Sequence, residues 1–161
     1  MTPDGSRVAV GGRRGLAGGA LVLALSMGTA SVLWGQRVRR ELGVQGYTLL
    51  GTDGRFGVGL IGALRVGPRA RVSLFAGADG GTGRMAGRAE ALGHLLLSPG
   101  RKRGVGGYLA GGLAVDLVVR PEARIVALVG IEDRPGGRSG WALEAGVGGG
   151  WRVAAGWRWR R

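Results

Sequence analysis

The stretch from Arg55 to Gly67 reads RFGVGLIGALRVG, and its alternation decides how the chain folds. It contains GVGLIG, which fits the G-x-G-x-x-G spacing of a dinucleotide-binding loop. Such a loop follows a strand and opens a helix, so the hydrophobic period should change within it. Here a period of two continues through the glycines, with Phe56, Val58 and Leu60 on one face and mostly small or charged residues on the other. The stretch is therefore predicted to be a two-faced β-strand and not a phosphate-binding loop.

The same alternation recurs in seven further segments, each with one apolar face and one face of charged or small residues. These segments are 38–50, 69–79, 84–97, 104–119, 123–132, 140–148 and 151–160. Short turns rich in glycine and proline separate the segments, and connections this short join antiparallel neighbours. An even-numbered meander closes when its first strand pairs with its last. Residues 37–161 are therefore predicted to form an all-β, eight-stranded antiparallel up-and-down barrel.

The first part of the chain has a different composition. Arg7, Arg13 and Arg14 precede an uncharged run over 16–35, which contains small residues around Ala30. This run is long enough for a transmembrane anchor, but its strongly apolar part, 21–27, is short. A basic start, an apolar run and small residues are typical of a secretory signal peptide. We therefore interpret 1–30 as a cleaved signal peptide, with 31–36 as a short lead into the barrel.

The two faces of the predicted strands indicate which side is the interior. The charged face also carries glycines, alanines and tyrosines, as a narrow lumen requires, whereas the apolar face forms an unbroken coat. Aromatic residues on the apolar face lie near strand ends, as in the girdles of transmembrane barrels. These predicted membrane-interface aromatics are Phe56, Trp141, Trp151, Trp157 and Trp159. The barrel is therefore expected to cross a membrane with its apolar face outward.

Charges inside such a barrel need partners of opposite sign. The predicted interior charge network consists of Glu41, Arg65, Arg71, Arg84, Arg88, Glu90, Asp116, Arg124, Glu144 and Arg158. Turn positions give an expected register, in which Glu41 lies opposite Arg65 and both Arg84 and Arg124 lie opposite Asp116. The same reasoning places Trp141 opposite Trp157. Because side chains fill the interior of an eight-stranded barrel, no open pore is expected.

By this pattern, residues 37–161 resemble the small OmpA-like and OmpX-like outer-membrane barrels. The resemblance implies an N-terminus in the periplasm, a filled interior, surrounding outer-membrane lipid and insertion by the barrel-assembly machinery. The sequence departs from that family in two places. Trp159 is followed by Arg160 and Arg161, where the family usually ends on an aromatic residue, and the outward connections are short. Short outward loops argue against adhesion or ligand capture.

Catalytic and metal chemistry find little support in the sequence. His94 is the only histidine, and Glu90 lies on the same strand face. A lipid-hydrolysing enzyme needs a serine, a histidine and an acid within hydrogen-bond reach. Ser98 lies roughly 13 Å along the strand from His94, and only Ser73 or Ser139 could approach from another strand. His94 is therefore interpreted as a lumen residue in a protein that is not an enzyme. With one histidine and no cysteine, neither a metal site nor a cofactor is expected.

The net charge of +13 points to an anionic partner. The run Arg101-Lys102-Arg103 is interpreted as a solvated turn, and nucleic acid is disfavoured because no aromatic residues interleave with the basic ones. Arginines near the rim are instead expected to contact lipopolysaccharide phosphates. The predicted function is a non-enzymatic, structural protein of the bacterial outer membrane. The alternative is a secreted or periplasmic lipocalin-like barrel that binds a small apolar ligand.

Overall fold

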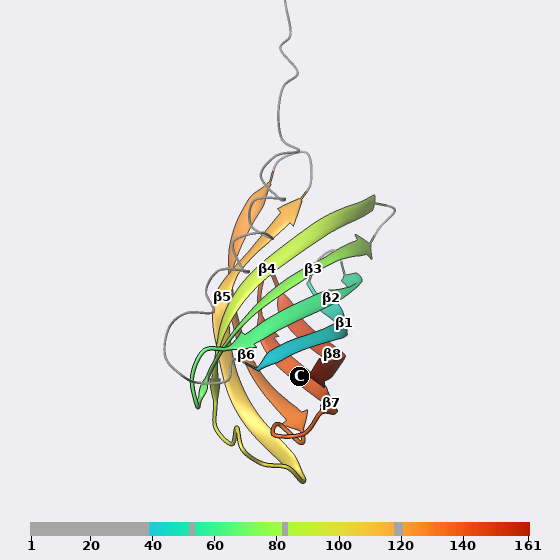
Figure 1. Cartoon of the computed structure of the whole chain (residues 1–161). Helices are drawn as coiled ribbons and strands as arrows, with labels where there is room; N and C mark the ends of the chain where they lie inside the picture. The colour runs from blue at the N-terminus through green and yellow to red at the C-terminus, as the bar shows by residue number, and fades with distance from the viewer. Residues whose placement is uncertain (1–38, 52–53, 82–83, 118–120) are drawn as a thin grey trace, which may run out of the picture. The chain divides into compact units, whose positions relative to one another are not determined.

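The computed structural model describes residues 39–51, 54–81, 84–117 and 121–161, and these form one closed antiparallel barrel (Figure 1). The strands are β1 (Arg40–Leu50), β2 (Arg55–Arg65), β3 (Ala70–Gly81), β4 (Arg84–Leu96), β5 (Val105–Leu117), β6 (Glu122–Asp133), β7 (Ser139–Val147) and β8 (Trp151–Arg160). Strands pair in chain order, and β1 closes on β8. The predicted fold class is confirmed, whereas the signal peptide over 1–30 and the lead over 31–36 lie outside the described residues.

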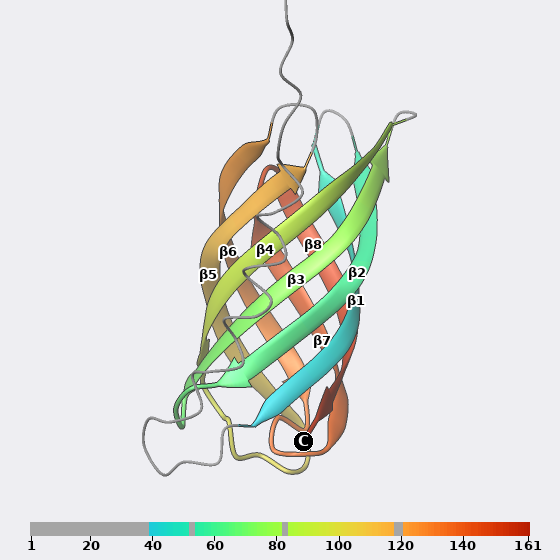
Figure 2. The same cartoon turned by 45° about the horizontal axis from the view of Figure 1, so that its top comes forward.

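The strands are inclined to the barrel axis, as Figure 2 shows. One end of the barrel holds Arg39, Arg161 and the connections 97–104 and 134–138. The other end holds the connection 148–150 between β7 and β8. These ends are called the Arg161 end and the Gly149 end below. No helix among the described residues is long and apolar enough to cross a membrane.

The register prediction is confirmed for the last hairpin only. Trp141 lies opposite Trp157, as expected. In the first hairpin Glu41 lies opposite Ala63 instead of Arg65, a shift of two residues.

Neither residue predicted to lie directly opposite Asp116 does so, although the side chain of Arg124 still reaches Asp116 at 3.5 Å. Arg88, not Arg84, lies opposite Asp116 across β4 and β5. Arg124 lies opposite Ala114 across β5 and β6. All of these shifts are even, so each side chain stays on its predicted face, because burial fixes the face while the turn fixes the register.

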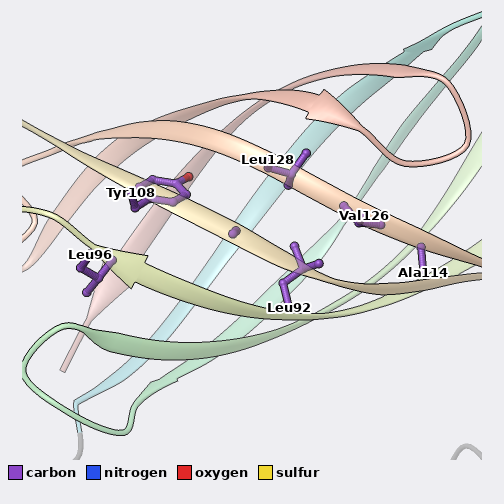
Figure 3. Close-up of a cluster of buried hydrophobic side chains, with 7 residues drawn as sticks. Leu92, Leu96, Tyr108, Ala114, Val126 and Leu128 are labelled. Carbon is purple, nitrogen blue, oxygen red and sulfur yellow. The ribbon is translucent and has the colours of Figure 1, made fainter.

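The inner face combines charged side chains with two small apolar clusters. One consists of Leu92, Leu96, Tyr108, Ala110, Ala114, Val126 and Leu128 (Figure 3). The other consists of Tyr47, Leu49, Ile61, Phe75 and Ala154. Leu92 and Leu96 lie on the charged side of the sequence pattern and are buried in the lumen. The large aliphatic side chains on the opposite face are exposed, and they include Leu42, Val58, Leu60, Leu109, Leu113, Ile125 and Val129.

Inward-facing glycines allow neighbouring strands to approach closely. A Cβ on Gly59 would overlap the backbone oxygen of Ala76, and one on Gly57 would meet the ring of Tyr47. These are the first two glycines of the GVGLIG motif, and both lie within β2. The motif therefore makes room inside a narrow barrel, and its spacing follows from the strand period of two.

Gly112→Ala is expected to destabilise the barrel by about 1–3 kcal/mol, because its new methyl group would overlap the backbone oxygen of Ala91. The neighbouring Gly111→Ala is the matched control. It points outward, and its added Cβ would lie 3.6 Å from the Val126 oxygen, so its effect should stay within about 0.5 kcal/mol. Urea unfolding of both variants in the same vesicles measures the difference, and equal losses would contradict this explanation.

Candidate functional site

The barrel encloses a chain of ion pairs that runs from one end of the lumen to the other. Its carboxylates are Glu41, Asp79, Glu90, Asp116, Glu132 and Glu144. Its guanidinium groups are those of Arg55, Arg65, Arg71, Arg88, Arg152, Arg158 and Arg160. The two signs nearly balance, so the lumen carries little net charge.

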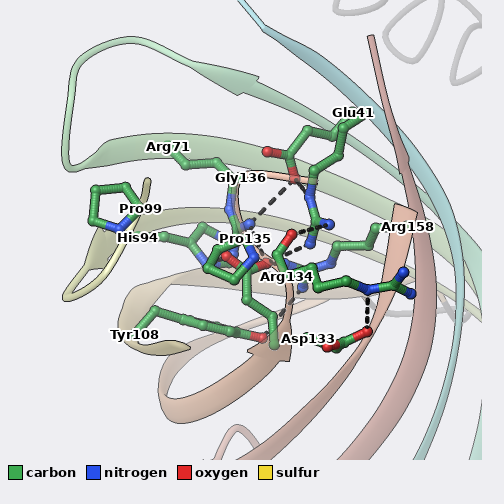
Figure 4. Close-up of polar contacts among 12 residues, drawn as sticks. Glu41, Arg71, His94, Pro99, Tyr108, Asp133, Arg134, Pro135, Gly136 and Arg158 are labelled. Carbon is green, nitrogen blue, oxygen red and sulfur yellow. Dashed lines mark hydrogen bonds and ion pairs between the residues drawn. The ribbon is translucent and has the colours of Figure 1, made fainter. Parts of the chain in front are cut away.

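Near the Arg161 end, Glu132 draws three arginines together (Figure 4 draws part of this cluster). Its Oε2 accepts hydrogen bonds from Arg71 Nη1 and Arg160 Nη2, both at 2.9 Å. Arg158 Nη1 lies 3.6 Å from the same oxygen. Arg71 also donates to Glu41 Oε2 at 3.2 Å, so this carboxylate shares the cluster. One carboxylate from β6 thereby joins β3 to β8 across the lumen.

In the middle of the barrel, Glu144 is held by three donors. Oε1 accepts from Tyr108 Oη at 2.7 Å and from Arg158 Nη2 at 2.8 Å, and Oε2 accepts from Gln45 Nε2 at 2.6 Å. Arg152 Nη2 lies 3.9 Å from Oε2. The carboxylate is therefore neutralised and hydrogen-bonded at the same time, as a buried charge requires.

Towards the Gly149 end, Arg88 joins two carboxylates. Its Nε donates to Glu90 Oε1 at 2.7 Å and its Nη1 donates to Asp116 Oδ1 at 2.9 Å. Arg55 Nη2 bridges Asp116 and Asp79, at 3.1 and 3.0 Å. Arg152 Nη1 lies 2.9 Å from Glu90 Oε2 and connects this group to Glu144.

Two tyrosines separate like charges within the network. The Tyr108 ring lies against the guanidinium groups of Arg71 and Arg158, at 5.0 and 5.5 Å from its centroid. The Tyr47 ring lies against those of Arg152 and Arg88, at 5.2 and 5.6 Å. Each phenol also donates to a carboxylate, Glu144 or Asp79. Each ring therefore spaces two cations and attracts both.

Most of the residues named from the sequence lie in this network. They are Glu41, Arg65, Arg71, Arg88, Glu90, Asp116, Glu144 and Arg158. Arg124 lies at the rim, where it pairs with Glu122 at 2.6 Å and with Asp116 at 3.5 Å. The side chain of Arg84 lies outside the described part of the chain. Sequence reasoning missed Arg55, Asp79, Glu132, Arg152 and Arg160, although all of them fall on the inward face of the alternation.

Two connections cover the lumen at the Arg161 end. Arg65 donates to the carbonyl oxygens of Pro99 and Pro135, one in each connection. Gly136 N donates to Arg101 O at 2.8 Å, and Pro135 is almost fully buried. Figure 4 draws both prolines together with Arg71 and His94. The interior is therefore capped at this end by backbone that an inward-facing arginine holds.

Ser73 and His94 approach each other from β3 and β4 as a nucleophile and its base would. Ser73 Oγ lies 2.7 Å from His94 Nε2, but Arg71 Nη2 lies 3.3 Å from Nδ1. A guanidinium group only donates hydrogen bonds, so Nδ1 must accept and the proton of a neutral ring sits on Nε2. In this state Nε2 donates to Ser73 and cannot remove its proton. A catalytic triad has a carboxylate where Arg71 stands.

The histidine NMR spectrum should therefore show a neutral ring protonated on Nε2. Because His94 is the only histidine, ¹⁵N labelling of histidine in the folded chain gives a single pair of ring signals. Ser73→Ala should keep the same tautomer, since Arg71 determines it. A ring protonated on Nδ1 would show that the Arg71 contact is not the one that orients His94.

The aromatic residues form two groups on the outer face. Trp159 and Trp157 lie on β8 towards the Arg161 end, with Trp141 opposite Trp157. Trp151 and Phe56 lie near the Gly149 end, and both are largely exposed. Exposed aliphatic side chains occupy the surface between the two groups.

Comparison with known proteins identifies the fold. No family model matches the sequence, and no curated protein matches it. The structure is similar to the crystal structure of the N-terminal β-barrel domain of Pseudomonas aeruginosa OprF, with a TM-score of 0.55 and 11% sequence identity. The similarity covers 78% of this chain and 100% of the OprF chain. The described residues therefore have the fold of the OmpA-like eight-stranded β-barrels.

Proposed function

We propose that this chain is a non-enzymatic β-barrel protein of a Gram-negative outer membrane, with a structural role in the envelope. One observation carries the proposal, the inverted polarity of the barrel. Arg71 and Arg88 are each 1% exposed, whereas Leu60 is 67% and Ile125 is 77% exposed. A continuous apolar coat of this kind marks a surface that faces hydrocarbon.

The spacing of the aromatic groups supports a bilayer as the surrounding medium. Trp151 and Trp159 lie on the same face of β8, eight residues apart. That spacing gives roughly 26 Å along the strand. Because strands in such barrels are tilted by about 40° from the barrel axis, it corresponds to roughly 20 Å along that axis. Transmembrane barrels present an apolar band of about 25 Å between two aromatic girdles. In this proposal the Arg161 end faces the periplasm, as the family resemblance implies, and the barrel-assembly machinery inserts the chain.

The lumen supports a structural role rather than transport or catalysis. Ion pairs along the interior and the contacts of Arg65 with the cap at the Arg161 end support a filled lumen. Arg71 occupies the position that the acid of a hydrolase would need. The lipocalin-like alternative requires an apolar interior for its ligand, whereas buried ion pairs lie beside the apolar clusters of this lumen among the described residues.

In planar bilayers the folded chain is expected to give no large, stable unitary conductance, because ion pairs close the lumen along its length. The measurement is single-channel recording after insertion is verified by heat-modifiable migration in electrophoresis. Long-lived openings of uniform size would contradict a filled interior.

Membrane fractionation of cells that express the full chain tests the proposed function. The protein should sediment with the outer membrane, resist release by high salt and require detergent for extraction. Recovery from the periplasm without detergent would contradict the proposal and favour the lipocalin-like alternative. Ester hydrolysis of lipids that is lost on His94→Gln would instead support an enzyme.

A further inference from the structure

The exposed charge of the barrel is concentrated at one end. The Arg161 end carries exposed cationic side chains on every connection and on both flanking segments. These are Arg39, Arg40, Arg69, Arg101, Lys102, Arg103, Arg134, Arg138 and Arg161. Asp133 is the adjacent acid, and it is bonded to Arg134 at 2.7 Å. At the Gly149 end, the exposed pair Arg124 and Glu122 balances itself. Among the described residues, the excess of exposed positive charge therefore lies at the Arg161 end.

Part of this basic end forms a pocket. Arg39, Gly137, Arg138, Trp159, Arg160 and Arg161 line a cavity of about 550 Å³. Arg160 turns its guanidinium group inward to Glu132, whereas Arg39 makes one long bond of 3.4 Å to Gly136 O. The side chains of Arg138 and Arg161 make no ion pair or hydrogen bond with any other described residue. Three exposed guanidinium groups therefore surround one half-exposed indole ring with most of their donors available.

The backbone holds this pocket in place. Arg40 N donates to Arg161 O and Arg161 N donates to Arg40 O, at 3.0 and 2.9 Å. Arg160 N donates to Arg138 O at 2.7 Å. The segments that carry the three exposed arginines are thus tied to the ends of β1 and β8. The backbone therefore keeps the three arginines next to one another, so that their side chains can reach the same ligand.

We propose that this pocket, here called the Arg138 pocket, binds the phosphate of an anionic glycerophospholipid. The inference rests on the proposed function, which places Trp159 at the membrane interface and this end in the phospholipid leaflet. Guanidinium groups bind phosphate through paired N–H donors, and interfacial indole rings lie at the depth of lipid headgroups. Trp159 provides an apolar wall for the glycerol, while Arg39, Arg138 and Arg161 provide the charge.

The test compares two triple variants of equal charge. Arg39→Gln/Arg138→Gln/Arg161→Gln alters the pocket, and Arg101→Gln/Lys102→Gln/Arg103→Gln removes the same charge from a turn at the same end. Phosphatidylglycerol and phosphatidylcholine are titrated onto the full-length folded protein in detergent, and bound lipid is counted by native mass spectrometry. Wild type should prefer phosphatidylglycerol by about tenfold or more, since each basic residue near a membrane contributes about 1 kcal/mol. The pocket variant should lose this preference, and the turn variant should keep it within about twofold.

Several results would overturn the proposal. An equal loss of phosphatidylglycerol preference in both triple variants would show that the overall positive charge of this end attracts the lipid and that the Arg138 pocket is not a specific site. Tighter binding of lipopolysaccharide, or of a single-stranded oligonucleotide, would assign the basic end to another partner. Displacement of phosphatidylglycerol by equimolar inorganic phosphate would show that the lipid itself is not recognised. The single variant Arg138→Gln keeps the test available if a triple variant folds poorly. Heat-modifiable migration shows separately whether the barrel folds and inserts into a bilayer. A failure to insert would contradict the proposed function and not only the lipid site.

Discussion

Glu132→Gln is expected to destabilise the folded barrel by about 3–5 kcal/mol, the largest effect of any single substitution proposed for this chain. Glutamine keeps the size of the side chain but removes the charge that Arg71, Arg158 and Arg160 share. The three guanidinium groups would then remain buried beside one another with a neutral acceptor. Breaking a buried pair costs this much because the remaining charge stays desolvated.

The same strand offers a matched control. Glu122 begins β6, and its side chain is 61% exposed, whereas the Glu132 side chain is 1% exposed. Glu122→Gln breaks only the rim pair with Arg124 and should cost less than about 1 kcal/mol. Urea titration of both variants in phospholipid vesicles, followed by tryptophan fluorescence, gives the two free energies of unfolding. A Glu132→Gln loss no larger than that of the control would mean that water solvates the lumen charges.

Leu60→Arg is expected to destabilise the barrel by about 2–4 kcal/mol in a bilayer, because it places a charge on the apolar face near the middle of β2. Leu50→Arg makes the same exchange on the outer face at the end of β1, where the cost should be about 0–1 kcal/mol. The arginine at position 50 can extend its charged group into water, whereas the one at position 60 lies too deep for this.

Unfolding in vesicles of defined thickness measures both arginine variants. The difference between them depends on the bilayer and not on packing inside the barrel, since both side chains point outward. If Leu60→Arg were harmless and the variant more soluble without detergent, the apolar face would not contact lipid. That single result would contradict the proposed membrane location.

The sequence predicted the strands and their faces well, because burial imposes a period of two that glycine does not interrupt. Leu92 and Leu96 illustrate this. The alternation along β4 places these two apolar residues on the charged face, and both are buried in the lumen. The register was harder to predict. A shift by any even number of residues leaves every face unchanged, so only the turn geometry distinguishes Arg84 from Arg88, four residues away, as the residue opposite Asp116.

The composition of the charge network was predicted incompletely for a related reason. The lumen is narrow enough for Arg71 on β3 to reach Glu132 on β6, two strands that are not hydrogen-bonded to each other. Reasoning from adjacent hairpins finds only neighbours, so Glu132 and Arg160 were missed. The contact between Ser73 and His94 was also invisible from spacing alone, because it depends on the register of β3 against β4.

The pairing of β1 with β8 has a consequence for the nascent protein. Glu41 lies beside Arg160 although nearly the whole barrel separates them along the chain. A growing chain that stops before Trp151 leaves β1 and β7 with open edges, and it lacks the arginines of β8 that pair with Glu144 and that help Arg71 to neutralise Glu132. In the proposed membrane location, partial hairpins would carry Glu144 without its arginines into hydrocarbon, so we do not expect them to persist as inserted intermediates. If the chain lies in a membrane as proposed, its insertion should therefore be a cooperative, all-or-none event that waits for the last strand to be made.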